Sequence, residues 1–283
     1  MTPLTFRFGT VGSPKSTPGK PGGSVGAIQQ INTLGLNALE LGWVQSVRVS
    51  AETCSTIRSA AASLDVAVSV HAPYFINLNA DDDEWPKSRK RLMDAAFFGR
   101  LAGATDIIFH PGSYFGKSAD EVKVIATSRL SGCMDELVSK GIDVRLRPET
   151  MGKSAMLGSL EDTLAFSQLP GVLPCMDFAH LHARYGDGTI NSYDEWCRIV
   201  EQYAAKLGTE SLKNLHIHLS GIEYGPKGEK NHLPVQESDL DINGLFKALS
   251  NFGCGGRILC ESPLLEVDAA YLKAAWIEIS GQG

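Results

Sequence analysis

Short apolar runs alternate with longer segments of helical periodicity along the whole chain. The apolar runs are rich in β-branched residues and end at glycine, proline or a polar residue, which is typical of buried strands. They predict eight strands, at residues 6–12, 37–42, 68–71, 105–110, 142–150, 171–177, 214–219 and 257–261. The periodic segments between them predict eight helices, at residues 24–34, 51–64, 85–103, 119–140, 157–169, 193–207, 240–251 and 267–279.

Strict alternation of eight strands with eight helices favours a closed parallel barrel, the (β/α)8 or TIM barrel, over an open doubly wound sheet. A barrel of this kind commonly takes about 250 residues as one domain. No shift in composition that would mark a linker divides the chain of 283 residues. We therefore expect one α/β domain over residues 1–283, with the active site at the C-terminal ends of the strands.

Composition describes an ordinary globular protein, with 43% hydrophobic and 20% charged residues. A formal net charge of -6 gives no footprint of a strongly basic nucleic-acid binder. It does not exclude one, because bound divalent metals would add positive charge where a phosphate would lie. The six cysteines form no C-x-x-C pair and are expected to be reduced thiols. Because neither a membrane span nor a signal peptide is recognisable, we expect no membrane association and a cytoplasmic location.

Potential metal ligands stand where the predicted strands end. All seven histidines fall at these ends or in the loops beyond them, accompanied by three carboxylates. For a single histidine such as His182 or His216, a hydrogen-bonded structural role is an equally good interpretation. Several buried acids and histidines together are costly unless they coordinate cations. The residues at strand ends are His71, His110, Glu149, Asp177, His218 and Glu261.

Five ordered motifs resemble those of the endonuclease IV family, the class II abasic-site endonucleases of the xylose isomerase-like TIM barrel superfamily. They are His71-Ala72-Pro73-Tyr74, Phe109-His110-Pro111-Gly112-Ser113, Glu149-Thr150, Asp177-Phe178-Ala179-His180 and His218-Leu219-Ser220. The resemblance implies a monomeric enzyme that uses two or three metal ions, Zn2+ or possibly Mn2+. It also implies cleavage of the phosphodiester 5′ to an abasic site in double-stranded DNA, giving a 3′-hydroxyl and a 5′-deoxyribose phosphate.

The resemblance also implies a role for each ligand. His71 and His110 would bind one metal, which Glu149 would bridge to a second metal held by Asp177, His218 and Glu261. His180 and His232 would bind the third. Glu149 and Glu261 would thereby take part in catalysis. Carboxylates and imidazoles suit Zn2+ or Mn2+, and two ions about 4 Å apart suit phosphoryl transfer.

The third site departs from the family pattern. An Asp precedes the last loop histidine by two positions in the family, whereas Lys230 stands two positions before His232 here. Three interpretations remain open. Glu229 could replace the Asp by a shift of one residue, the Lys230 ammonium could stand in for the third ion, or this ion could be weak or absent.

Substrate contacts are expected from the loops that follow the strands. Tyr74 and Phe75 stand where the family inserts side chains against a distorted duplex, a use that fits apolar wedges. Packing beneath the loop is an equal alternative for both. Ser113 is a candidate phosphate contact.

Two other functions remain open. Related barrels that isomerise or epimerise sugars hold one divalent ion with two Glu, an Asp and a His at strand ends, the positions of Glu149, Asp177, His218 and Glu261. Two or three ions per chain would favour the nuclease, and one ion the isomerase. A barrel that binds damaged DNA without cutting it is the third possibility.

Overall fold

The computed structural model describes residues 5–282, and its centre is a sheet of eight parallel strands. In spatial order the sheet runs β5-β4-β3-β2-β1-β10-β7-β6. Backbone bridges from Leu146 to Val172 and from Glu149 to Cys175 connect the two ends of this order, so the sheet closes on itself. The strands are β1 (Phe6–Val11), β2 (Ala38–Gly42), β3 (Ala67–His71), β4 (Asp106–Phe109), β5 (Arg145–Pro148), β6 (Cys175–Asp177), β7 (Leu215–Leu219) and β10 (Gly256–Cys260).

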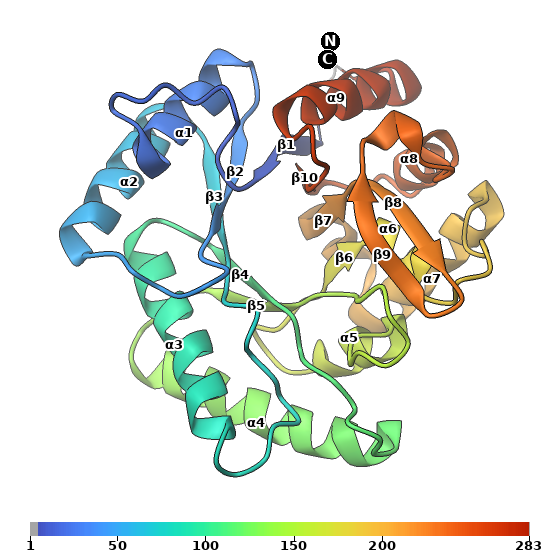
Figure 1. The fold of residues 1–283 in the computed structure, drawn as a ribbon. Helices are drawn as coiled ribbons and strands as arrows, with labels where there is room; N and C mark the ends of the chain where they lie inside the picture. The colour runs from blue at the N-terminus through green and yellow to red at the C-terminus, as the bar shows by residue number, and fades with distance from the viewer. Residues whose placement is uncertain (1–4, 283) are drawn as a thin grey trace.

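Eight helices surround the strands on the outside (Figure 1). Several of them begin at a serine N-cap. The Ser50 side chain accepts a hydrogen bond from the backbone amide of Thr53, and Ser118 forms a capping box with Glu121. These helices are α1 (Gly23–Thr33), α2 (Ala51–Ser63), α3 (Trp85–Leu101), α4 (Ala119–Ser139), α5 (Leu160–Phe166), α7 (Tyr193–Leu207), α8 (Ile242–Asn251) and α9 (Glu266–Ser280). The single-domain (β/α)8 barrel predicted from the sequence is confirmed.

Additional elements lie between β6 and α8. The helix α6 (Phe178–Ala183) follows β6 directly because the Asp177 carboxylate accepts the amide of His180 at 2.7 Å. Strands β8 (Gly221–Gly225) and β9 (Gly228–Leu233) form an antiparallel hairpin that lies beside α6 (Figure 1). Two 3-10 turns, η1 (Thr209–Asn214) and η2 (Val235–Glu237), complete this part of the chain.

A charge network closes the N-terminal end of the barrel. Asp106, at the start of β4, is fully buried and accepts from Arg147 at 2.6 Å and from Arg145 at 3.0 Å. Arg257 of β10 lies 3.2 Å from its second oxygen. This network stands at the opposite end of the strands from the predicted ligands and therefore serves the fold.

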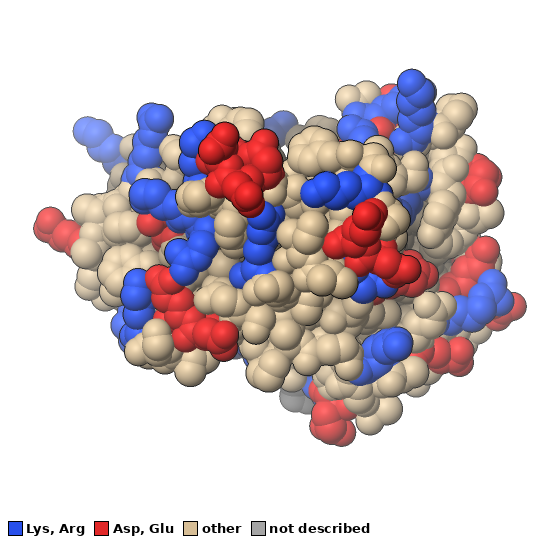
Figure 2. Space-filling model, turned by 90° about the horizontal axis from the view of Figure 1, so that it is seen from below, with Lys and Arg blue, Asp and Glu red and all other residues tan. Residues whose placement is uncertain are grey.

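The face of the molecule over α3 and α4 carries basic and acidic groups intermingled (Figure 2). The basic side chains of α3 pair with nearby acids, for example Lys87 with Glu84 and Lys90 with Asp94. Basic groups paired in this way form a solvated face and leave little net charge for binding a polyanion. Among the helices within residues 5–282, none has the length and hydropathy needed to cross a membrane.

Candidate metal centre

The predicted ligands converge at the C-terminal ends of the barrel strands. His71 and Asp177 are the last residues of β3 and β6, and His218 lies near the end of β7. His110, Glu149 and Glu261 follow directly after β4, β5 and β10. Because parallel strands end at one rim, residues far apart in the sequence meet there.

Glu149 stands between two groups of ligands. Its Oε2 atom lies 3.4 Å from Nε2 of His71 and 3.2 Å from Nε2 of His110. Its Oε1 atom lies 3.2 Å from Nδ1 of His218. Each oxygen of this carboxylate therefore faces a different set of imidazoles. The carboxylate is fully buried, and charges interact strongly in such a low-dielectric environment.

The second group consists of four residues whose candidate ligand atoms all lie within 4.8 Å of one another: Glu149, Asp177, His218 and Glu261. Within residues 5–282, the buried atoms Glu149 Oε2 and Asp177 Oδ2 have no hydrogen-bond donor. Unsatisfied buried carboxylate oxygens are costly unless a cation meets them. The donor set therefore fits a divalent metal ion.

Histidines compensate the buried carboxylates. Burial opposes the charge of Glu149, but His218 and His110 outweigh it and hold the pKa of this carboxyl well below its usual range. Burial raises the pKa of Asp177 to about 6. Burial also opposes protonation of His180, yet Asp177 and Glu149 raise the pKa of this imidazole to about 9. Divalent cations could supply the positive charge that these protons supply.

The third group, Asp177, His180 and His232, gives a further reason to expect a cation. His180 Nδ1 lies 2.9 Å from the Thr150 carbonyl and His232 Nδ1 lies 3.2 Å from the Glu261 carbonyl. A carbonyl only accepts, so each imidazole carries a hydrogen on Nδ1. Because His180 is also protonated on Nε2, that hydrogen points to the Nε2 lone pair of His232 at 3.2 Å. A shared ion would take the place of this hydrogen.

A β-bulge in the hairpin decides which side chain accompanies His232. Glu223 pairs with Asn231 and Tyr224 with Glu229, so Lys230 is the extra residue. In a regular strand Lys230 would share a face with His232, because side chains alternate. The bulge turns Glu229 to that face instead.

The carboxylate of Glu229 accordingly lies 3.6 Å from His180 Nε2. A Cβ at Gly152 would approach Glu229 to 2.7 Å, so only glycine admits this hairpin so close to the centre. The Lys230 ammonium instead pairs with Glu223 at 3.1 Å and is exposed. The geometry thus brings Glu229, and not Lys230, toward the ligand cluster.

The three predicted substrate contacts differ in their surroundings. The Tyr74 ring stacks on His110 with a centroid distance of 5.0 Å, and it is 47% exposed. Phe75 is 58% exposed, with the Arg91 guanidinium 5.9 Å from its ring centroid. Ser113 donates to the Ala155 carbonyl at 3.1 Å. Phe75 is therefore the freest of the three to meet a substrate.

Sequence reasoning missed Glu40, a fully buried carboxylate in β2. It lies below the ligand cluster, with one oxygen 2.8 Å from His216 Nε2 and the other 3.1 Å from His218 Nε2. A lone glutamate within the apolar run Ala38-Leu39-Glu40-Leu41 was the available signal. The placement of the histidines also needed correction, because His180 and His182 lie in α6 and His216 lies inside β7.

The fold and the ligand cluster together define the class of protein. It is a (β/α)8 barrel whose strand ends carry overlapping groups of carboxylates and imidazoles. The model of the xylose isomerase-like TIM barrel family matches residues 28–277. The chain belongs to this family. An uncharacterized protein of Methanocaldococcus jannaschii is 36% identical over 273 residues, covering 96% of this chain and 97% of that protein.

Endonucleases and epimerases both occur among the similar proteins. A probable endonuclease 4 of Oceanobacillus iheyensis is 26% identical over 58% of this chain, which spans 55% of that relative. The structure of endonuclease IV from Thermus thermophilus superposes with a TM-score of 0.71 at 20% identity, covering 96% of this chain and 99% of the other. A D-tagatose 3-epimerase-like protein gives a TM-score of 0.72 at 16% identity, covering 98% of each chain. These structural likenesses establish the fold.

Proposed function

We propose that this protein is a metal-dependent endonuclease that cuts DNA on the 5′ side of an abasic site, leaving a 3′-hydroxyl and a 5′-deoxyribose phosphate. One observation carries the proposal. The group of His71, His110 and Glu149 adjoins the group of Glu149, Asp177, His218 and Glu261 through a shared carboxylate. A barrel that handles sugars with one divalent ion needs only the second group, whereas phosphodiester hydrolysis uses paired ions.

Each group has a definite task in this proposal. Bound ions, Zn2+ or Mn2+, would act as Lewis acids on the phosphate and lower the pKa of water. Glu149 would bridge the two groups, and Glu261 would bind the second ion beside His218, whose Nδ1 lies 3.3 Å from Glu261 Oε1. His71 donates through Nδ1 to the Ala72 carbonyl at 2.9 Å, which leaves Nε2 free for an ion.

A third ion would be held by Asp177, His180 and His232, with Glu229 in place of the family's aspartate. The bulge at Lys230 supports this assignment, because it turns Glu229 toward His180. Lys230 would then contribute to the hairpin and not to the site. The three interpretations left open by the sequence are thereby reduced to one proposal.

Double-stranded DNA containing an abasic site is the proposed partner of a monomeric, cytoplasmic enzyme. Tyr74, Phe75 and Ser113 stand on the loops after β3 and β4, beside the cluster. Exposed aromatic side chains in such loops can stack on bases that an abasic site leaves unpaired. The positive charge needed to meet the phosphates would come largely from the bound ions.

The test is nicking of a duplex with a single abasic site by protein loaded with Zn2+ or Mn2+. We expect a nick on the 5′ side of the lesion and none in the same duplex with an intact base. A known endonuclease IV assayed alongside controls for the substrate. Failure to nick while the control enzyme cuts would overturn the proposal.

A sugar isomerase or epimerase is the second candidate. The group of Glu149, Asp177, His218 and Glu261 alone would suffice for it, and epimerase-like structures superpose on this barrel. Counting bound metals separates the candidates, because one ion per chain favours the isomerase and two or three favour the nuclease. Tight binding of abasic DNA without cleavage would instead support the non-catalytic damage-binding barrel.

A further inference from the structure

Glu40 is a buried carboxylate inside the barrel, directly below the proposed metal centre. Ser69 donates to its Oε2 atom at 2.8 Å, and His216 Nε2 lies 2.8 Å from the same oxygen. The Oε1 atom faces His218 Nε2 at 3.1 Å. This contact is an ion pair, and neither Glu40 Oε1 nor His218 Nε2 has a hydrogen-bond partner within residues 5–282. Glu40 thus connects the lower layer of the barrel to one residue of the ligand cluster.

The contact at Nε2 determines what His218 presents at its other nitrogen. Carboxylates only accept, and both nitrogens of His218 face them, so without a metal the protonated imidazole directs one hydrogen from Nε2 to Glu40 and donates the other from Nδ1 to Glu149. Nδ1 also lies 3.3 Å from Glu261, within the four-residue ligand group. A divalent ion bound there would replace the Nδ1 hydrogen and leave the Nε2 hydrogen directed at Glu40.

We propose that Glu40 is a positioning residue that fixes the tautomer and ring orientation of His218, so that Nδ1 is presented to a divalent ion. The inference rests on the proposed metal-binding role of the group Glu149, Asp177, His218 and Glu261. Carboxylates in this position behind a ligand histidine also raise its basicity, and their loss commonly weakens metal binding about 10- to 100-fold.

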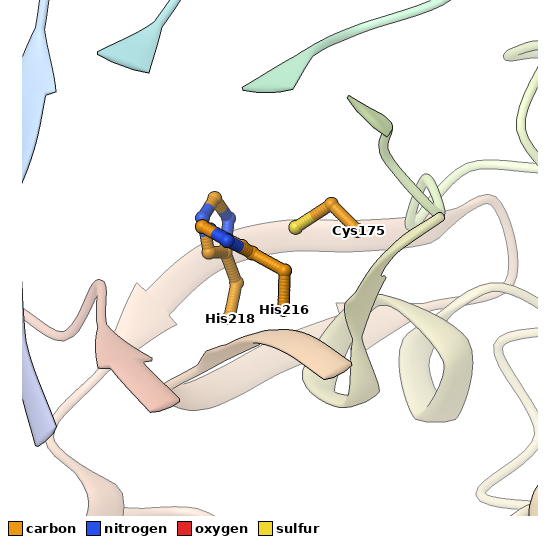
Figure 3. Close-up of side chains that lie close together, drawn as sticks. All are labelled: Cys175, His216 and His218. Atoms are coloured by element: carbon orange, nitrogen blue, oxygen red, sulfur yellow. The ribbon is translucent and has the colours of Figure 1, made fainter. Parts of the chain in front are cut away.

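Another possibility is a separate metal site in the lower layer. Cys175, His216 and His218 offer atoms within 4.8 Å of one another, and the Cys175 sulfur points toward the two imidazoles (Figure 3). Two facts favour positioning over ligation. His216 Nε2 is already engaged by Glu40, and His218 Nε2 faces the other oxygen of the same carboxylate at 3.1 Å.

The first test compares metal affinity in Glu40→Gln and a matched control. His216 and His218 face different oxygens of Glu40. Glutamine replaces one of these oxygens by an NH2 donor, so it cannot accept from both histidines. We expect metal-stripped Glu40→Gln to bind Co2+ 10- to 100-fold more weakly than wild type, with a changed ligand-field spectrum. The control Asp106→Asn removes another buried carboxylate, at the far end of the barrel, and should keep the wild-type affinity and spectrum.

A measurement on the wild-type protein covers the case in which Glu40→Gln does not fold. Nitrogen-15 NMR of the zinc-loaded protein reports the tautomer of each histidine. We expect the hydrogen of His218 on Nε2, and a hydrogen on Nδ1 would overturn the proposal. Wild-type Co2+ affinity in Glu40→Gln would overturn it as well. So would a sulfur-to-cobalt charge-transfer band that disappears in Cys175→Ser, because it would place the ion in the lower layer.

These readouts separate the inference from the proposed nuclease function. If the wild type binds ions and Glu40→Gln binds them weakly, the inference stands even when no DNA is cut. If the wild type cuts abasic DNA and Glu40→Gln keeps the full affinity, the inference alone fails. A wild-type protein that binds no ion would overturn both.

Discussion

Glu149 and His218 face each other across the end of the barrel, with Oε1 of the carboxylate 3.2 Å from Nδ1 of the imidazole. The other oxygen of Glu149 faces His71 and His110. One side chain therefore belongs to both ligand groups. Substitutions around it should show whether the two groups act as a single centre.

Glu149→Gln should abolish nicking of an abasic duplex while leaving the fold intact. Glutamine has nearly the same shape but lacks the charge needed to bridge two cations. We expect the number of tightly bound ions per chain to fall, as measured by elemental analysis of the purified variant. A circular dichroism spectrum like that of the wild type would show that the barrel persists. Near-normal turnover would refute the bridging role.

His71→Asn separates the nuclease from the isomerase. His71 lies 3.4 Å from Glu149 Oε2 and takes no part in the four-residue group. In the nuclease proposal the variant loses one ion and its activity on abasic DNA, while the ion of the four-residue group remains. Metal content and nicking are measured on the same preparation. A variant that keeps the wild-type metal content would contradict the first ligand group, and His182→Asn serves as a control outside the predicted ligands.

The barrel could be predicted from the sequence because each strand is a short apolar run and each helix shows the helical periodicity of apolar positions. The same order allowed the ligand set to be placed, since C-terminal strand ends must meet at one rim. The hairpin was missed because residues 221–233 are mostly polar and contain only a short apolar alternation, at Ile222 and Tyr224. Without its bulge, the choice between Glu229 and Lys230 could not be made.

The helix predicted at residues 157–169 illustrates a second limit. Only Leu160–Phe166 is helical, because Ser159 caps its start and the chain turns soon after Phe166. The predicted strand at residues 171–177 likewise shortens to Cys175–Asp177. Glu40 was missed for another reason. Its partners, His216 and Ser69, come from other strands, and their meeting depends on barrel closure rather than on local pattern.

Glu229→Gln should weaken binding of the third ion about 10- to 100-fold, and Lys230→Ala should leave the affinity for this ion unchanged. The reason is the bulge, which turns Glu229 toward His180 and Lys230 toward Glu223. Metal titration with a competing chelator measures both variants. Loss of the ion in Lys230→Ala with full affinity in Glu229→Gln would reverse the assignment.

Phe75→Ala should weaken binding of abasic DNA more than it slows catalysis. Phe75 is exposed, and loss of one aromatic stacking partner costs about 1–3 kcal/mol. The loop should persist, because Arg91 donates to the Phe75 carbonyl at 2.8 Å and not to its side chain. The measurement is the dissociation constant and kcat on one duplex. Phe97→Ala is a matched control, since Phe97 is exposed on α3. Equal effects of both variants would argue against a contact by Phe75.

Asp106→Asn should lower the free energy of unfolding by about 3–5 kcal/mol at neutral pH, because it leaves buried guanidinium groups without their partner. Burial opposes the charge of Asp106, but Arg147 and Arg257 outweigh it and hold its pKa well below the usual value.

The pH dependence of this effect follows from that lowered pKa. An unfolded aspartate titrates at about 3.9, so above this pH the ionised group contributes its full stabilisation. As the pH falls further, the unfolded chain takes up a proton that the folded protein refuses, and the contribution is progressively lost. The difference between wild type and Asp106→Asn should therefore be constant from about pH 8 to 5 and shrink below about pH 4. Urea unfolding across this range measures it, with Asp94→Asn as a surface control. A difference that grows on acidification would contradict the charge network.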